Sequence, residues 1–504
     1  MIELILFGTF AVLLFLGVPV AFSMGVAAFA AIIWQGGVHA LVPASAVLYA
    51  GMSSETLLAI PFFILAGTIM EVTGISARLI ALADACVGHR KTGIALTTII
   101  VALLFSSISG SGPATVAAIG GILIPALAKK GYAKRHAASL VASAGELGII
   151  IPPSIAYIVF AVVAADYERV SIGRLFMAGV IPGLTLLVAL YAVTFFLPRV
   201  GEIAKASARE HADRALDRVG LRAGGASGQG SATAAGAAPG EVAASGSTAS
   251  GVGATAAGAG VAKAERSEPA AVGVDVVRTV RAPWSEIWRA FYRAVPGLLV
   301  PVIILGGIYG GIFTPTESAA VACVYGLVVG LFVMRELSLR ELYRVFTAAG
   351  LASGRIMLII ATATVFAYVI TRNQIARTVA DWLLALTDSW VLLILIINLM
   401  LLIAGMFLDA ISAFYLFVPL FVPVMLELGM DITTIGVMMT MNLALGLITP
   451  PVGIDLFVAA GIAKIPFAEA VRGIGPFLAA GIAVLMLVTF VPALSNWLPD
   501  LLGL

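Results

Sequence analysis

A double proline occurs twice in this sequence, and it limits the fold more than any other feature. The first copy lies in residues 148–154 (GIIIPPS) and the second in residues 446–453 (GLITPPVG). A helix cannot continue through two prolines, because two amide donors are missing and the rings clash with the preceding turn. In lipid, such a break is tolerated only where protein or a water-filled cavity covers the freed backbone. One break in each half is typical of secondary transporters with two repeats around a midplane site.

The composition is that of an all-α polytopic membrane protein. Hydrophobic residues make up 61% of the 504 residues and charged residues 11%, against about 25% charged in soluble domains. The mean hydropathy is +1.09. The net charge of +2 gives no indication of a nucleic-acid partner. The sequence also lacks the Gly-Lys-Ser/Thr loop that cradles phosphates, so ATP is not predicted as the energy source.

Charge predicts a re-entrant hairpin over about residues 92–128 rather than a single crossing. Basic residues flank this segment on both sides, and neither flank carries an acid. Basic flanks are cytoplasmic, so both ends should lie on the same side of the membrane, with the Ser/Gly-rich tip reaching its middle. The flanking residues are His89, Arg90, Lys91, Lys129, Lys130, Lys134 and Arg135.

The rest of the chain predicts two repeats of one plan. Residues 1–200 form the first repeat, with one span over residues 2–34, bent at Gly17 and Pro19, and a broken crossing helix over about 137–164. Residues 283–504 form the second, with a hairpin over about 390–426, a broken helix over about 433–462 and a last span over 477–497. An interfacial aromatic and basic anchor is predicted over residues 284–293. An odd number of crossings between equivalent elements makes the halves inverted. Residues 201–282, rich in Ala and Gly, are predicted as a cytoplasmic linker.

The hairpin tips and broken helices are the predicted site. Broken ends present unpaired N–H and C=O groups, and carbonyls and hydroxyls suit Na⁺ whereas helix N-termini suit a carboxylate. We predict two sodium sites, one at each tip and break. The predicted sodium ligands are Ser107, Gly110, Gly112, Thr115, Pro152, Gly405, Asp409, Ser412, Thr449, Pro450 and Gly453, and the predicted substrate-binding residues are Ser109, Ser111, Ser154 and Arg355.

Each of these residues also has a purely structural interpretation. Serines are common as close-packing residues in membrane helices. Asp409 lies in an apolar stretch, where a carboxylate is costly unless paired, so it is a ligand or gating residue, or else a salt-bridged or boundary residue. Arg355 binds an anionic substrate or extends to the membrane surface. Glu55 and Glu317 are weaker candidates of the same kind. Glu146 is interpreted as a buried polar residue at a helix contact or a supporting group, and Asp455 follows the second break.

Five segments resemble the large membrane subunit of TRAP transporters, the DctM-like family. They are residues 109–120, 148–154, 176–183, 310–320 and 447–455. The resemblance implies an elevator-type, sodium-driven importer of organic anions in the bacterial inner membrane, such as C4-dicarboxylates or sugar and keto acids. It implies two partners, a small four-helix membrane subunit and a periplasmic substrate-binding protein, and it places the sodium ions at the two tip-and-break pairs. The long linker departs from the short connection usual in the family.

The sequence therefore predicts a sodium-coupled organic-anion importer without enzymatic activity or an organic cofactor. The nearest alternative is a sodium/carboxylate symporter of the same superfamily that works without a binding protein. A passive channel fits inverted symmetry less well. An intramembrane hydrolase would need a base beside a membrane serine, and the four histidines (His39, His89, His136 and His211) are all predicted in loops or at helix ends.

Overall fold

The computed structural model describes residues 1–90, 92–197, 281–387 and 389–504. All regular structure within these ranges is helical. Eight of the described helices are long and apolar enough to cross a membrane, or nine if one bent pair counts as a single span. The chain is therefore an all-α, multi-pass membrane protein, as its composition predicts. Nearly all of the predicted linker, residues 201–280, lies outside the described residues.

Each half contains a pair of helices joined by a short turn. In the first half, α6 (Gly93–Ser109) and α7 (Gly112–Lys129) pack on each other around a two-residue turn. Gly110 ends α6 with a φ of +61°, a conformation that favours glycine. In the second half, α17 (Trp390–Gly405) and α18 (Ala410–Glu427) form the equivalent pair.

Neither helix with a double proline is continuous. In the first half, α8 (Lys134–Gly145) and α9 (Leu147–Ile150) are followed, after the prolines, by α10 (Ile155–Ala164), with a bend of 45° at the break. In the second half, α19 (Ile432–Gly446) ends before the prolines and α20 (Ile454–Ala463) begins after them. The prolines thus interrupt both helices, because each proline lacks an amide donor and its ring clashes with the preceding turn.

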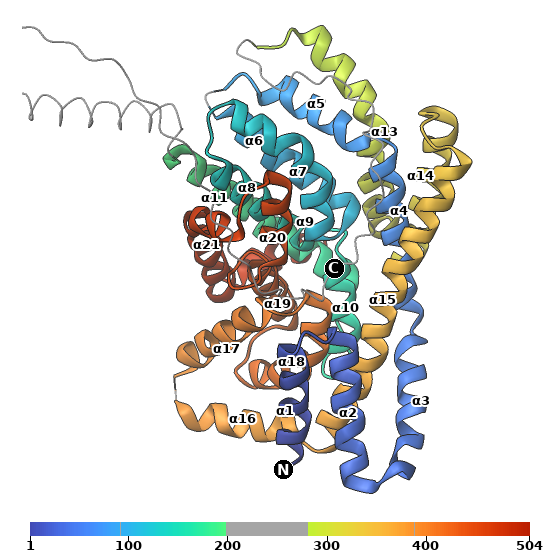
Figure 1. Cartoon of the computed structure of the whole chain (residues 1–504), viewed down its shortest axis with the longest axis vertical. Helices are drawn as coiled ribbons and strands as arrows, with labels where there is room; N and C mark the ends of the chain where they lie inside the picture. The colour runs from blue at the N-terminus through green and yellow to red at the C-terminus, as the bar shows by residue number, and fades with distance from the viewer. Residues whose placement is uncertain (91, 198–280, 388) are drawn as a thin grey trace, which may run out of the picture.

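The two halves interlock through these broken helices. The α20 segment packs on α7 and α8 of the first half, and α10 packs on α18 of the second half. Two long helices close the group, since α21 (Phe467–Phe490) contacts α8 and α19, and α11 (Ile172–Phe196) contacts α19 and α21. In Figure 1 the α6–α7 pair lies in the upper part of the molecule and the α17–α18 pair in the lower part. The inverted relation of the halves remains a prediction.

A second group of helices runs along the other side of the molecule (Figure 1). Its long members are α13 (Trp284–Tyr309) and α15 (Leu339–Arg372). They pack with α14 (Pro315–Val328), α4 (Ala59–Val72) and α5 (Ile75–Val87). The groups meet where α15 contacts α18 and where α4 and α5 contact α6. The first tip lies beside α4, since a methyl group built on Gly67 would lie 3.4 Å from the Cα of Ser109.

The prediction of one helix over residues 2–34 is wrong. The structure has two helices there, α1 (Ile2–Phe15) and α2 (Val20–Gly36), which pack on each other. Gly17 has a φ of +81° and Pro19 caps α2, so the chain reverses instead of bending. A further helix, α3 (Leu41–Met52), follows where no helix was predicted.

Two boundaries in the second half also differ from the prediction. Trp284 and its aromatic neighbours, expected as a separate interfacial anchor, are continuous with the span of α13. The last span, expected over 477–497, starts ten residues earlier as α21 and ends at Phe490, before a separate short helix, α22 (Ala493–Leu501). Apolar length alone does not show where one helix ends and the next begins, because short polar turns lie inside apolar runs.

Candidate functional site

Hydroxyl groups meet at the turn between α6 and α7. The Ser109 and Thr115 hydroxyl oxygens are 2.9 Å apart, and the Thr115 hydroxyl donates to the main-chain oxygen of Ser111 at 2.8 Å. Ser109 and Thr115 are buried, and Ser111 is half-buried. The Ser107 hydroxyl instead donates to the Leu104 carbonyl one turn back, which is the ordinary role of serine inside a helix. The tip therefore concentrates hydroxyl and carbonyl oxygens at a largely buried place.

This tip lies directly against the first helix break. A methyl group built on Gly110 would lie 3.0 Å from the Pro153 carbonyl oxygen, and one on Gly148 would lie 2.7 Å from the Ser111 carbonyl oxygen. The backbones approach this closely only because both residues are glycines. Ser154 begins the second part of the helix, is fully buried, and donates a short hydrogen bond to the Ile149 carbonyl. The structure thus brings together the predicted residues of the first site.

The second tip contains a charged residue. Asp409 is half-buried and caps α18, because its carboxylate accepts hydrogen bonds from the Ile411 and Ser412 amides at 3.1 and 3.3 Å. The Ser412 hydroxyl donates to the other carboxylate oxygen at 2.6 Å. Asp409 therefore has a structural role as a helix cap, which was only the alternative interpretation from the sequence. Its role as a sodium ligand remains a prediction.

The second break has a different exposure from the first. A methyl group on Gly446 would lie 2.5 Å from the Cα of Gly405, so break and tip touch through their backbones. The Thr449 hydroxyl donates a hydrogen bond to the Leu445 carbonyl at 2.6 Å. Whereas Pro152 and Pro153 are buried, Pro451 and Val452 are exposed. The second break therefore reaches the surface of this chain.

Two buried carboxylates beside the first tip were not assigned as ligands from the sequence. Glu146 caps the end of α8 and Asp455 lies in the first turn of α20, and both are fully buried. Glu146 had been considered only as a buried polar or supporting group, and Asp455 only as a residue after the break. The signal that singled out Asp409, an acid within an apolar stretch, applies equally to Asp455.

Three candidates lie at the surface of the chain. Arg355 is exposed on α15, unlike the buried hydroxyls of the first tip. Glu317 is exposed and accepts from the Thr314 amide at 2.7 Å, completing a capping box at the start of α14. Glu55 is exposed, and its carbonyl accepts from the Thr316 hydroxyl at 3.4 Å. Substrate binding by Arg355 remains a prediction.

His136 lies at a helix end, as predicted, in the first turn of α8, but it is buried. The nearby serine on the same helix, Ser139, donates to the carbonyls of Arg135 and Ala470 at 2.7 and 3.2 Å. Its hydroxyl is thus committed to main-chain oxygens, and the pair does not form the serine–base contact that a hydrolase requires.

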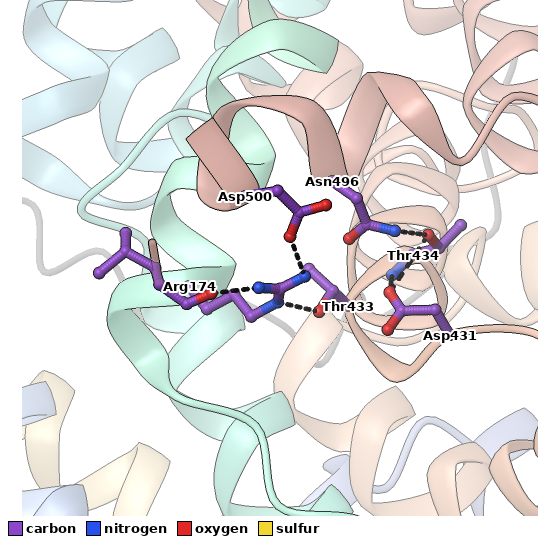
Figure 2. Close-up of polar contacts among 7 residues, drawn as sticks. Arg174, Asp431, Thr433, Thr434, Asn496 and Asp500 are labelled. Carbon is purple, nitrogen blue, oxygen red and sulfur yellow. Dashed lines mark hydrogen bonds and ion pairs between the residues drawn. The ribbon is translucent and has the colours of Figure 1, made fainter. Parts of the chain in front are cut away.

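A polar cluster ties the C-terminal helix to the fold (Figure 2). Arg174, at the start of α11, forms an ion pair with Asp500 of α22 at 2.8 Å and donates to the Thr433 hydroxyl at 3.0 Å. A further hydrogen bond joins Arg174 to the main-chain oxygen of Leu504. Asn496 of α22 donates to the Thr434 hydroxyl at 3.1 Å. The cluster connects α11, α19 and α22, and sequence analysis did not identify it.

Known proteins with similar sequences are permease subunits of TRAP transporters. A C4-dicarboxylate TRAP transporter large permease protein, DctM, of Pseudomonas aeruginosa is 37% identical over 450 residues, covering 89% of this chain and 87% of that protein. The isethionate TRAP transporter permease protein DctMQ of Oleidesulfovibrio alaskensis is 36% identical over 490 residues, covering 97% of this chain and 65% of that protein.

A solved structure supports the fold. The YdaH transporter of Alcanivorax borkumensis superposes with a TM-score of 0.53 at 12% sequence identity, covering 98% of this chain and 97% of that one. Residues 7–494 match the family model described as the tripartite ATP-independent periplasmic transporter, DctM component. The chain therefore belongs to the DctM family of tripartite ATP-independent periplasmic transporters.

Proposed function

We propose that this chain is the transporting membrane subunit of a sodium-coupled importer of organic anions. The observation that carries the proposal is the contact between the first tip and the first break. There, hydroxyls and carbonyls of Ser109, Ser111 and Thr115 lie against a broken helix in a buried position. Such oxygen groups suit Na⁺, and the N-terminus of the second helix segment suits a carboxylate.

The proposed mechanism uses the two groups of helices. Sodium binds at the tips first and orders them, and the substrate anion then completes the site. The group that contains both tips and both breaks moves past the group that contains α13 to α15, which carries the site across the membrane. The sodium gradient supplies the free energy for transport. Sodium and substrate shift the balance between the two positions of the moving group only by the difference in their affinity for those positions.

The substrate class and the partners rest on the relatives. The names of those relatives specify isethionate or C4-dicarboxylates, which are all small organic anions. The family description is tripartite and periplasmic, which supports a small four-helix membrane subunit and a periplasmic substrate-binding protein as partners. The bacterial inner membrane is the location in which such an assembly would work, with residues 201–282 on the cytoplasmic side.

Reconstitution in proteoliposomes tests this proposal. The chain is assembled with the small subunit, and uptake of a labelled organic anion is measured with the binding protein outside, under an inward sodium gradient or an equal potassium gradient. Uptake should require sodium. Ser109→Ala and Thr115→Ala should raise the half-saturating sodium concentration. Uptake of equal rate in both gradients would contradict the proposal.

The same experiment separates the alternative symporter. Omitting the binding protein should abolish uptake if the tripartite assembly is correct. Full sodium-dependent uptake without it would favour a transporter that binds its substrate directly. No chemical change in the recovered anion is expected, because the residues that the structure describes place no serine–base pair at the site.

A further inference from the structure

Glu146 and Asp455 are two fully buried acids without hydrogen-bond partners. Both side chains have 0% exposure. All four of their carboxylate oxygens lack a hydrogen-bond partner among the residues that the structure describes. This is unusual, because buried carboxylates are normally paired, hydrogen-bonded or bound to a metal. At the second tip, by contrast, both carboxylate oxygens of Asp409 accept hydrogen bonds.

The two carboxylates come from different halves and meet at the first tip. A methyl group built on Gly112 would lie 2.6 Å from the Asp455 carboxylate, and one on Gly145, next to Glu146, would lie 3.3 Å from it. Two glycines thus leave the space that Asp455 occupies. The second broken helix thereby places its acid on the hairpin and helix of the first half.

The described part of the chain offers these acids no positive partner. Its ion pairs join Met1 with Glu3, Arg78 with Glu336 and Arg174 with Asp500. Two like charges in a buried site repel each other, and an ionised carboxylate within the membrane is costly unless paired. The pair therefore requires a bound positive charge to be ionised.

Further oxygen atoms lie on the same side of α8. Ser143 precedes Glu146 by three residues, so both lie on one helix face. The Ser143 side chain has 0% exposure, and its hydroxyl also lacks a partner among the described residues. The Gly112 carbonyl oxygen would lie 3.3 Å from a methyl group on Gly145. Carboxylate, hydroxyl and carbonyl oxygens together are the ligands that a hard monovalent cation takes in transporters.

We propose that Glu146 and Asp455 hold a third sodium ion, next to the sodium site predicted at the first tip, whose ligand Gly112 lies beside Asp455. The assignment of sodium rests on the proposed sodium coupling. The ion neutralises one acid from each half and joins α8 to α20, so its binding stabilises the contact between the first hairpin and the second broken helix. Its loss leaves the two carboxylates to repel each other across that contact.

The test is the sodium dependence of thermal stability of the purified full-length chain in detergent. Glu146→Gln and Asp455→Asn remove the charges with little change in shape, and Glu469→Gln is the control, because Glu469 is an exposed acid in the first turn of α21. Melting midpoints are measured over a series of NaCl concentrations, with choline chloride holding the ionic strength constant. Each bound ion adds a stabilisation that grows with its concentration.

In each charge-removing variant, the rise of the melting midpoint with the logarithm of the sodium concentration should be about one third less steep than in the parent, because one of three ions is lost. The double variant should lose no more than either single variant. In choline alone, both single variants should melt above the parent, because the repulsion is gone. Bound ²²Na⁺ at equilibrium should fall by one ion per chain in these variants and remain unchanged in the control.

Several outcomes would overturn the third site. A full sodium slope and unchanged ²²Na⁺ binding in both variants would show that the acids hold no sodium. A second such outcome is a parent that is stabilised by low pH and not by sodium. If the variants abolish that stabilisation, a proton and not sodium occupies the pair. A larger effect of CaCl₂ than of NaCl, lost in the variants, would assign a divalent ion. A parent with no response to sodium at all would instead contradict the proposed sodium coupling.

Discussion

At the scale of single residues, Asp409 shows that one carboxylate has a structural use that sequence alone does not reveal. It was selected because it lies within an apolar run, and the structure shows it capping α18 through the Ile411 and Ser412 amides. A cap needs an oxygen acceptor but no charge, whereas a cation ligand benefits from the charge. The two roles are therefore separable by substitution.

Asp409→Asn should keep the cap and lose the charge, whereas Asp409→Ala should lose both. We expect the asparagine variant to melt near the parent and the alanine variant to be destabilised by about 1 kcal/mol. If Asp409 is a sodium ligand, both variants should need more sodium for half-maximal uptake. Equal sodium dependence in parent and asparagine variant would leave only the capping role. Melting curves and uptake in proteoliposomes measure the two effects.

At the scale of elements, the breaks depend on glycines that let backbones touch. Gly405 ends α17 and Gly446 ends α19. A side chain on either glycine would collide with the backbone of the other. The double prolines alone predict where the helices stop. They do not predict which tip packs on which break, because that choice depends on distant segments meeting in space. The placement of α20 on α7 and α8 of the other half is a further example.

Gly446→Ala should destabilise the second tip and break. The added methyl would lie 2.5 Å from backbone atoms of Gly405, which no side-chain movement can relieve. Overpacking of this kind costs about 1–3 kcal/mol. Gly121→Ala, in α7 with no atom within 4 Å of the added methyl, is the matched control and should be neutral or stabilising. Thermal unfolding in detergent compares them, and equal midpoints would argue against a tight contact.

At the scale of the whole molecule, α22 is joined to two other helices by polar contacts near the end of the chain. Figure 2 shows Arg174 of α11 reaching both Asp500 and Thr433, with Asn496 bonded to Thr434 beside them. Asp500 is largely exposed, at 61%. Exposed ion pairs contribute only about 0.2–1 kcal/mol. The stability of this region therefore depends on the several hydrogen bonds of Arg174 rather than on the ion pair.

Arg174→Ala should loosen α22 more than Asp500→Asn does. The arginine variant loses the contacts to Thr433 and to the Leu504 carbonyl as well as the ion pair. We expect faster amide hydrogen exchange in α22 for Arg174→Ala and a smaller increase for Asp500→Asn. Exchange in α6, which contains no residue of the cluster, should stay unchanged in both variants. A similar increase in both would show that the ion pair dominates.

The sidedness of the first hairpin can be measured through its neighbouring cysteine. Cys86, near the end of α5, is exposed, and Cys323 is buried. A membrane-impermeant maleimide should label Cys86 only from the cytoplasmic side of vesicles, as the basic flanks predict, and a Cys86→Ser variant is the control. Partial burial raises the pKa of the Cys86 thiol, so labelling should accelerate as the pH rises, because the thiolate is the reactive form. Labelling only from the periplasmic side would contradict the predicted topology.

The sequence by itself determined the membrane class, the two helix breaks and the family, because hydropathy, double prolines and local motifs are properties of short segments. It also indicated the residues of the first tip and of the first break, since the glycines, prolines and hydroxyls of each are clustered within one short segment. Only the tertiary structure decided the reversal between α1 and α2, the capping role of Asp409, and the meeting of Glu146 with Asp455. The last of these depends on which distant helices pack together, and side-chain burial and close backbone approach are set by that packing rather than by local pattern.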